Sequence, residues 1–535
     1  MSMVRWSGWA TRSSRSCLCP SARTTTWVTF RWARRPLPDL GARIRRRGRS
    51  LMATGPFMVI CARLSSATGC REDTILSSQR ETARGFPARF NIPGTRVLAL
   101  VLATAVVAYL AWKIGQSPPQ ALQFAFNGIA VGAVYALLAM GFTLVYSTVW
   151  FFDLYYGAAA ALGAYGVFYL RTATALGSRA DVNNVYVNAV FAAVVGGVVA
   201  WVLYTLLHPR LRGRFTPNTI GVASGLLGGG AGAYTGIVLA FPENLHLTLS
   251  PAIGVVVAAA AIVVPFWAVQ TFVPNIRLSR FTAIAGLPAV VIGAWCGYLT
   301  AGAPGAGLYL SWAVSCLLAG CVGLALYRGL YMYMRERARS PLIMLVASLG
   351  ILLAVAAFIV IVFEAAPRPL PTAFGSETWK IAGARIKGFN IFAIGVALAG
   401  FAILWLLLKQ TSFGRAVRAI GDDEEVSKVV GINTTVIIAG VFFIGAMYAA
   451  LAGILTGHDT AVQPRMGLLL LLKGWIASVV GGIGNLYGAI VGGFVLGVVE
   501  QFGIWDLAGE WKDAIAFVLL ILFLSFWPQG LLPRR

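Results

Sequence analysis

Apolar runs of roughly 20 residues recur along most of the chain, separated by short polar loops. An α-helix needs about 20 residues to cross the hydrocarbon core of a bilayer. The strands of a membrane barrel would instead alternate over about 10 residues, and this pattern is absent. The chain is therefore predicted to be an all-α, polytopic transmembrane helical bundle with about 12–14 spans. The predicted segments are 97–116, 121–147, 157–170, 187–207, 219–241, 250–270, 281–300, 306–327, 341–363, 391–409, 434–456, 467–501 and 512–527.

The apolar segment 467–501 is too long for one plain span. Exposed backbone groups at membrane depth are tolerated only where protein or a cavity covers them. We therefore expect a broken or re-entrant helix, interrupted at central residues that are small or polar, namely Gly481, Gly482, Gly484, Asn485 and Gly488.

Basic residues gather in short loops, and such loops favour the cytoplasmic side of a membrane. With the N-terminus inside, the alternation of spans places four basic loops there, at 208–214, 275–280, 335–339 and 414–418. This arrangement requires the Gly-rich segment 219–241 to span. The loop 367–389 then lies outside, and the C-terminus lies inside if 467–501 crosses twice.

The composition agrees with a membrane protein, because 58% of the residues are hydrophobic and 12% are charged. Soluble domains carry about 25% charged residues. The net charge of +24 does not favour nucleic acid as a partner, since the basic residues lie in the N-terminal region and in short loops. The seven Cys and three His are scattered, so no metal site or disulfide framework is predicted.

The first 95 residues are rich in Arg, contain no Lys, and show no helix or strand period. Three interpretations are open for this extension. It has the composition of an unselected reading frame in GC-rich DNA, which we favour. The alternatives are a disordered cytoplasmic tail and an organelle targeting segment, which is also Arg-rich and poor in acidic residues.

Residues 414–433 form a charged, helix-prone segment between two apolar spans. Gly414 begins this segment, and Arg415 and Arg418 share a helix face at spacing i, i+3. The acidic run 422–425 can cap or begin a second short helix, and Gly431 is placed to end it. From these residues alone, both a docking segment and a solvated, salt-bridged loop are open.

Several polar residues in or beside the spans are candidates for a translocation path. Asp153 lies at a predicted membrane boundary, where a carboxylate either lines a polar path or caps the following helix. Lys473 and Glu500 can form a buried pair, although we expect each to reach the membrane surface with its long side chain. The candidate path residues are Asn127, Asp153, Tyr155, Tyr156, Gly157 and Asn485.

Three regions taken together resemble permeases of the branched-chain amino-acid ABC transporter family. The first is 121–166, which contains Asn127, Gly128, Tyr135 and the run LGAYG. The second joins Arg418-Ala419, the acidic run and the sequence VVGIN at 429–433, and the third is the Gly-rich stretch 473–500. The resemblance extends over about 97–170 and 308–535. It departs at 153–157, where the family has an Asn-Phe-Ala-His-Gly type of sequence and this chain keeps only Gly157.

The resemblance divides the chain into an extension (1–95), a permease core in two parts (96–171 and 306–535), and an inserted region of four membrane segments (172–305). In the second part of the core, residues 410–433 correspond to the family's cytoplasmic coupling loop. The residues expected at the ATPase are Gly414, Arg415, Arg418, Ala419, Asp422, Asp423, Glu424, Glu425, Gly431, Ile432 and Asn433.

The function that the resemblance implies is that of a permease subunit of an ATP-binding-cassette importer in the bacterial inner membrane. Its cargo would be a branched-chain or other hydrophobic amino acid, or a related small amide or urea. Its partners would be cytoplasmic ATP-binding subunits, a second permease subunit, a periplasmic solute-binding protein and the lipid bilayer. The chain has no phosphate-binding loop of its own, and neither an enzyme activity nor a bound cofactor is expected. An ion-coupled secondary transporter and a structural membrane subunit are the alternatives.

Overall fold

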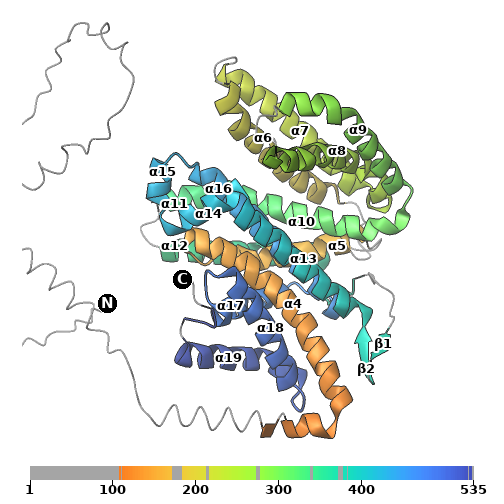
Figure 1. The fold of residues 1–535 in the computed structure, drawn as a ribbon, viewed down its shortest axis with the longest axis vertical. Coiled ribbons are helices and arrows are strands. Elements are labelled where there is room, and N and C mark those ends of the chain that lie inside the picture. Colours follow the sequence, from red (N-terminus) through yellow and green to blue (C-terminus); the bar gives the residue numbers. More distant parts are fainter. Residues whose placement is uncertain are drawn as a thin grey trace, which may run out of the picture. The chain divides into compact units, whose positions relative to one another are not determined.

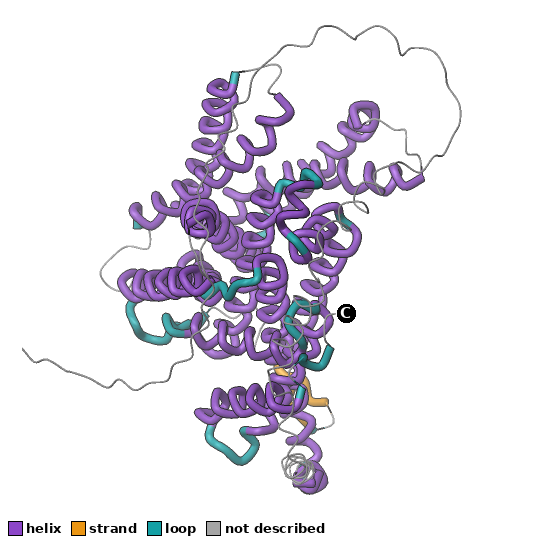
Figure 2. The backbone as a smooth tube through the Cα atoms, turned by 90° about the vertical axis from the view of Figure 1, so that its left-hand side faces the viewer, coloured by secondary structure: helices purple, strands orange, loops and turns teal. Residues whose placement is uncertain are grey.

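The computed structural model describes residues 108–109, 111–171, 184–211, 216–272, 278–337, 341–370, 378–381, 383–527 and 529–532. The chain divides into Met1–Arg96 and Val97–Arg535, and the fold below is that of the second unit. The extension 1–95, most of segment 97–116 and the terminal 533–535 lie outside the described residues. The predicted all-α membrane fold is confirmed, since the described residues are mostly helical and include a small hairpin (Figures 1 and 2).

The helices are α4 (Pro118–Val149), α5 (Tyr155–Arg171), α6 (Val185–Leu211), α7 (Pro217–Ala240), α8 (Leu245–Phe272), α9 (Leu278–Ala301), α10 (Gly307–Leu326), α11 (Met332–Arg337), α12 (Pro341–Phe363), α13 (Gly388–Gln410), α14 (Ser412–Asp422), α15 (Glu424–Val429), α16 (Thr434–Thr460), α17 (Met466–Gly481), α18 (Leu486–Gly503) and α19 (Lys512–Phe526). A π-helical segment (Tyr327–Tyr331) joins α10 to α11. The strands β1 (Thr378–Ile381) and β2 (Ala384–Lys387) pair antiparallel, with Trp379 opposite Ile386.

Nine helices among the described residues are long and apolar enough to cross a membrane. The predicted interruption of 467–501 is present, since α17 ends at Gly481 and α18 begins at Leu486. The two helices pack against each other, and a Cβ at Gly481 would lie 1.9 Å from the carbonyl oxygen of Gly488. The chain returns to this break near its end, where the Leu532 N–H donates to the Gly481 carbonyl at 2.9 Å.

The core is built from helices that cross at small residues. Along the crossing of α4 with α18, a Cβ at Gly497 would lie 2.3 Å from the backbone nitrogen of Gly132. In the crossing of α5 with α16, a Cβ at Gly453 would lie 2.0 Å from the Ala160 carbonyl oxygen. Such contacts bring helix backbones together in lipid, where van der Waals packing replaces the hydrophobic effect as the driving force.

Helices α6–α9 correspond to the region predicted as an insertion, and they pack as two pairs, α6 with α7 and α8 with α9. Both α6 and α8 contact α10, and Figure 1 shows the four helices beside it. A hydrogen bond of 3.0 Å from the Tyr169 hydroxyl to Asn188 Oδ1 joins α5 to α6.

The bundle has two ends that are distinguished by their contacts. At one end, which we call the coupling end, the indole Nε1 of Trp150 donates to the Gly421 carbonyl at 3.0 Å, and Arg335 pairs with Glu424. At the other, which we call the hairpin end, the backbone of Arg368 bridges Val462, and Lys387 lies 3.8 Å from Asp459. The grouping of Arg335 with the segment 414–433 agrees with the prediction that both lie on one side of the membrane.

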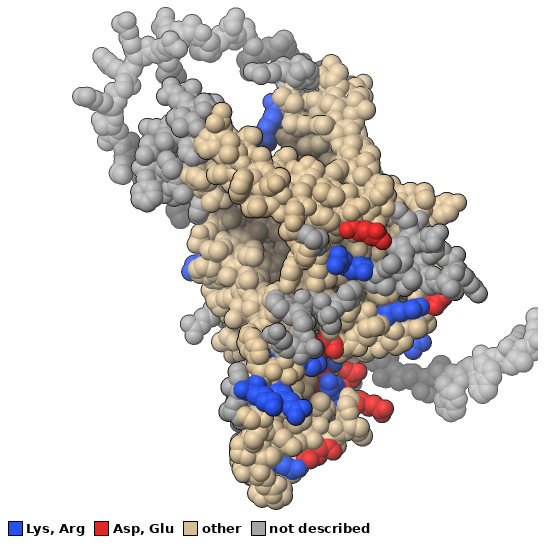
Figure 3. All heavy atoms as spheres, turned by 90° about the vertical axis from the view of Figure 1, so that its right-hand side faces the viewer, with Lys and Arg blue, Asp and Glu red and all other residues tan. Residues whose placement is uncertain are grey.

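On the face drawn in Figure 3, charged side chains are sparse and large areas between them are uncharged. This is expected of surface that meets lipid, where charged side chains are costly.

Candidate functional site

The segment 414–433 folds into two short helices at the coupling end. The Thr411 side chain caps α14 by accepting from the Gly414 N–H at 3.2 Å. One face of α14 is buried through Gly414, Val417, Ile420 and Gly421. Arg415 and Arg418 share a face of this helix, as their spacing predicted, and both are exposed.

The acidic run divides between the two helices. Asp422 ends α14, and the side chain of Asp423 caps α15 by accepting from the Val426 N–H at 3.0 Å. Glu424 and Glu425 occupy the first turn of α15, where the helix dipole stabilises negative charge. The cap that the sequence allowed is therefore formed.

The end of α15 depends on Gly431, whose φ is +91°. The Gly431 N–H donates to the Lys428 carbonyl at 3.0 Å, and the Ile432 N–H donates to Ser427 at 3.0 Å. Asn433 then caps α16 by accepting from the Val436 N–H at 3.3 Å. No described atom lies within 4 Å of a Cβ placed on Gly431, so the glycine is required here for its backbone conformation.

The valines of this segment are not among the contact residues predicted from the sequence. Val426, Val429 and Val430 are 57%, 88% and 75% exposed in the described structure. Apolar residues at i, i+3 and i+4 in a charged loop were the available signal. We call these exposed valines, together with the exposed Arg415 and Arg418 of the preceding helix α14, the coupling-end patch. Accessible apolar residues combined with charge are typical of a protein-binding surface.

One ion pair joins α15 to the bundle, and a cavity separates part of α14 from it. Arg335 on α11 pairs with Glu424, which also accepts from Lys428 at 2.9 Å. A cavity of about 360 Å³ lies between α14 and the ends of α4, α13 and α18, and its lining includes Arg418 and Gly484. α14 packs directly on α4, α13 and α16, and the cavity lies between it and the helix break at 482–485.

Most predicted path residues bind other parts of the fold through their polar atoms. Tyr155 donates to the Ala319 carbonyl at 3.0 Å and Tyr156 to the Leu138 carbonyl at 2.8 Å. Gly157 packs on α17, because a Cβ there would lie 2.5 Å from the carbonyl oxygen of Gly467. Their role in transport stays a prediction.

Asp153 is buried in the link between α4 and α5. Its Oδ1 caps α5 by accepting from the Tyr155 N–H at 3.0 Å, and it also accepts from the Tyr331 hydroxyl at 2.7 Å. Burial raises the pKa of the Asp153 carboxyl to about 6, against these two hydrogen bonds, which lower it.

Asn127 and Asn485 lie at opposite ends of the bundle. Asn127 on α4 accepts from Asn390 Nδ2 at 2.9 Å, toward the hairpin end. Asn485 caps α18 through the Tyr487 N–H at 3.0 Å, and its Nδ2 donates to the Leu532 carbonyl at 3.0 Å.

The expectation that Lys473 and Glu500 reach the membrane surface was wrong. Lys473 Nζ lies 2.9 Å from Glu500 Oε1, and Glu500 is 1% exposed. The same ammonium group lies 3.0 Å from the Tyr135 hydroxyl and 3.1 Å from Asp513. The helix break folds α18 back along α17, so that two residues far apart in sequence become neighbours.

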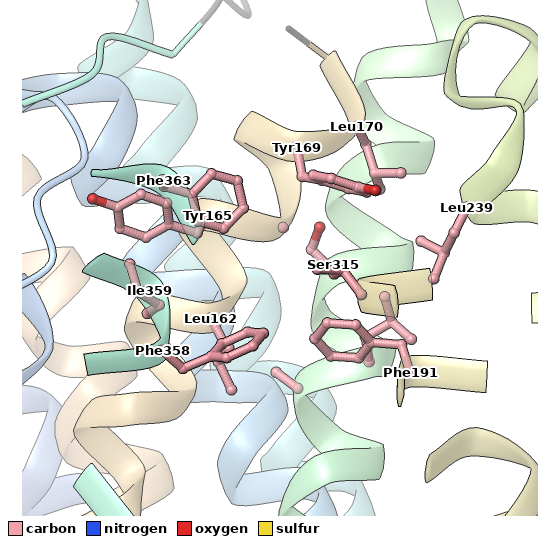
Figure 4. Close-up of a pocket in the computed structure, with 14 residues that line it drawn as sticks. Leu162, Tyr165, Tyr169, Leu170, Phe191, Leu239, Ser315, Phe358, Ile359 and Phe363 are labelled. Carbon is pink, nitrogen blue, oxygen red and sulfur yellow. The ribbon is translucent and has the colours of Figure 1, made fainter. Parts of the chain in front are cut away.

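Two cavities differ in the solutes they can hold. A cavity of about 270 Å³ at the hairpin end includes Tyr135, Asn390, Lys473 and Glu500 in its lining. The cavity in Figure 4 measures about 40 Å³ and is enclosed mainly by aromatic and aliphatic side chains of α5, α6, α10 and α12. The second cavity is too small and too apolar for a charged solute. Among the described residues, no group of three or more His, Cys, Asp or Glu side chains is placed to hold a metal ion.

Residues 252–524 match the family model described as the permease component of branched-chain amino acid transport systems. This match begins within the region 172–305, which the sequence interpretation treats as an insertion. No solved structure matches.

Individual relatives match over a smaller part of the chain. The permease protein BraD of a high-affinity branched-chain amino acid transport system from Pseudomonas aeruginosa is 33% identical over 231 residues, which are 42% of this chain and 74% of BraD. LivH of Escherichia coli, named for the same kind of system, is 32% identical over 41% of this chain and 72% of LivH. The fructose import permease FrcC of Rhizobium meliloti is 29% identical over 25% of this chain and 40% of FrcC.

Proposed function

Because the chain belongs to the family of permease components of branched-chain amino acid transport systems, we propose that it is the membrane-spanning permease subunit of an ATP-binding-cassette importer. Its cargo is a branched-chain or other hydrophobic amino acid, or a related small amide or urea. The importer works in the bacterial inner membrane.

The observation that carries this proposal is the exposed patch on α14 and α15. Val426, Val429 and Val430 are accessible, although burial would stabilise them, and Arg415 and Arg418 of α14 are exposed as well. An ATP-binding subunit that covers the patch would bury the valines and pair with the arginines. The other partners are a second permease subunit and a periplasmic solute-binding protein at the hairpin end.

The proposed movement follows from the contacts of α14. ATP binding in the partner shifts α14, and the packing of α14 on α4, α13 and α16 transmits this shift to the spans. Bistable elements of this kind convert a local contact into alternating access.

Association with the ATP-binding subunit tests the proposal. Arg418→Glu and Val429→Asp are expected to reduce co-purification of that subunit at least about tenfold, since each places a charge in the contact. Arg385→Glu in β2 makes the same charge change at the hairpin end and is the matched control. The proposal of docking at α14–α15 fails if both patch variants insert normally and retain the ATP-binding subunit as the control does.

A further inference from the structure

The cavity at the hairpin end is large enough for a solute. Its lining comes from α4, α13, α16, α17, α18 and α19, and its volume is about 270 Å³. One water needs about 10–15 Å³ by the same kind of measure. The cavity lies at the end opposite α14 and α15, where a solute delivered from outside would enter.

Glu500 gives this cavity an unsatisfied acceptor. Its Oε1 accepts from Lys473 at 2.9 Å, whereas its Oε2 is buried and has no hydrogen-bond partner among the described residues. A buried carboxylate oxygen without a partner is costly, and more so than a neutral acceptor. An ammonium group in the cavity would supply the missing donor.

Lys473 does not serve as the cation for a bound solute. Its three N–H donors already face Glu500, the Tyr135 hydroxyl at 3.0 Å and Asp513 at 3.1 Å. Lys512 also lines the cavity and forms no ion pair with a described residue. Its ammonium group is therefore available to a carboxylate.

The rest of the lining is largely apolar, with Val134, Leu455, Met466, Leu469 and Leu470 among its members. A site with an acceptor, a separate cation and an apolar wall matches the three parts of an apolar α-amino acid. We propose that this cavity binds the zwitterion of such an amino acid, with its ammonium group at Glu500 Oε2, its carboxylate at Lys512 and its side chain on the apolar wall. The proposal deepens the proposed function and rests on its amino-acid cargo.

Binding of radiolabelled L-leucine to the full chain in lipid nanodiscs tests the site, with two analogues as competitors. Isopentylamine keeps the ammonium group and lacks the carboxylate. Isocaproate keeps the carboxylate and lacks the ammonium group. We expect L-leucine to bind at least about tenfold more tightly than either analogue, because each analogue loses one charged contact. Absence of saturable leucine binding, or equal binding of all three compounds, would overturn the proposal.

Variants assign the two ends of the ligand. Glu500→Gln is expected to weaken the binding of L-leucine and isopentylamine about tenfold or more and to leave the binding of isocaproate unchanged. Lys512→Met should weaken the binding of L-leucine and isocaproate and leave the binding of isopentylamine unchanged. Asp506→Asn, which changes a carboxylate paired with Lys113 outside the cavity lining, is the control and should change none. Equal weakening of all three compounds by Glu500→Gln would show a structural role and overturn the assignment, as would no effect.

A third variant keeps the ion cluster intact in case Glu500→Gln does not fold. Leu469→Trp fills the cavity from its apolar wall and is expected to abolish leucine binding. Unchanged leucine affinity in this variant would contradict the site. Failure of the proposed function can be told apart from failure of this site. In that case leucine would still bind, and the variants would weaken binding as predicted, while no ATP-dependent uptake would occur.

Discussion

Lys473 on α17 and Glu500 on α18 form an ion pair of 2.9 Å, with Glu500 almost completely buried. The pair joins the two helices on either side of the break at 482–485. Removal of one partner from a buried pair leaves an uncompensated charge, which is more costly than removal of both. The pair therefore fixes the packing of the last two core helices and sets the charge of the hairpin-end cavity.

Lys473→Met is expected to lower the free energy of unfolding by about 3–5 kcal/mol, because Glu500 loses its counter-charge in a buried position. The double variant Lys473→Met/Glu500→Leu should recover most of this loss. Denaturant titration in detergent measures both, and Lys113→Met at the exposed pair with Asp506 is the control. Equal losses in the single and double variants would contradict the buried pair.

Gly431→Ala is expected to destabilise α15 by about 1–2 kcal/mol, since a left-handed backbone conformation is unfavourable for a residue with a Cβ. Hydrogen exchange of the backbone amides in 424–433 would detect the loosened helix end. Gly350→Ala on α12, where a Cβ meets no described atom within 4 Å, is the matched control. Unchanged exchange in Gly431→Ala would show that the positive φ carries no cost.

Gly497→Ala is expected to separate α18 from α4 and to cost about 1–3 kcal/mol, as overpacking does. The added Cβ would lie 2.3 Å from the backbone nitrogen of Gly132, which has no flexible side chain to move. Gly395→Ala on α13 meets no described atom and should be neutral. Thermal denaturation of both variants in detergent decides between a tight crossing and a tolerant one.

Asp153 predicts a pH dependence of stability. Its folded-state pKa of about 6 lies above the ordinary value of 3.8 because of burial. The folded state therefore binds the proton more tightly, so stability is higher below pH 4 and falls as the pH rises to 6. Asp153→Asn keeps a capping side chain and should flatten this part of the stability curve by about 1–3 kcal/mol. A curve of unchanged slope between pH 4 and 6 would contradict the assignment.

The sequence was sufficient for features that depend on local composition. The length of the hydrophobic runs located the helices. Gly481 and Gly482 marked the break because glycine is conformationally free, and Asn485 marked it because its side chain can cap the next helix. The acidic run and Gly431 marked the ends of α15 for the same local reasons.

Features that depend on long-range packing could not be predicted from the sequence. Lys473 meets Glu500 only because α18 folds back along α17, and no local pattern specifies that register. The exposure of Val429 follows from how α15 lies on the bundle. For Asp153, the sequence allowed both a path and a cap, and only the position of Tyr155 and Tyr331 shows which contacts it makes.

The most direct test of the proposed function is uptake of radiolabelled L-leucine into proteoliposomes that contain the full chain, its second permease subunit and the candidate ATP-binding subunits, with the solute-binding protein outside. We predict uptake that requires internal ATP and is lost with Arg418→Glu, while a proton gradient alone drives none. Uptake driven by a proton gradient without ATP would contradict it.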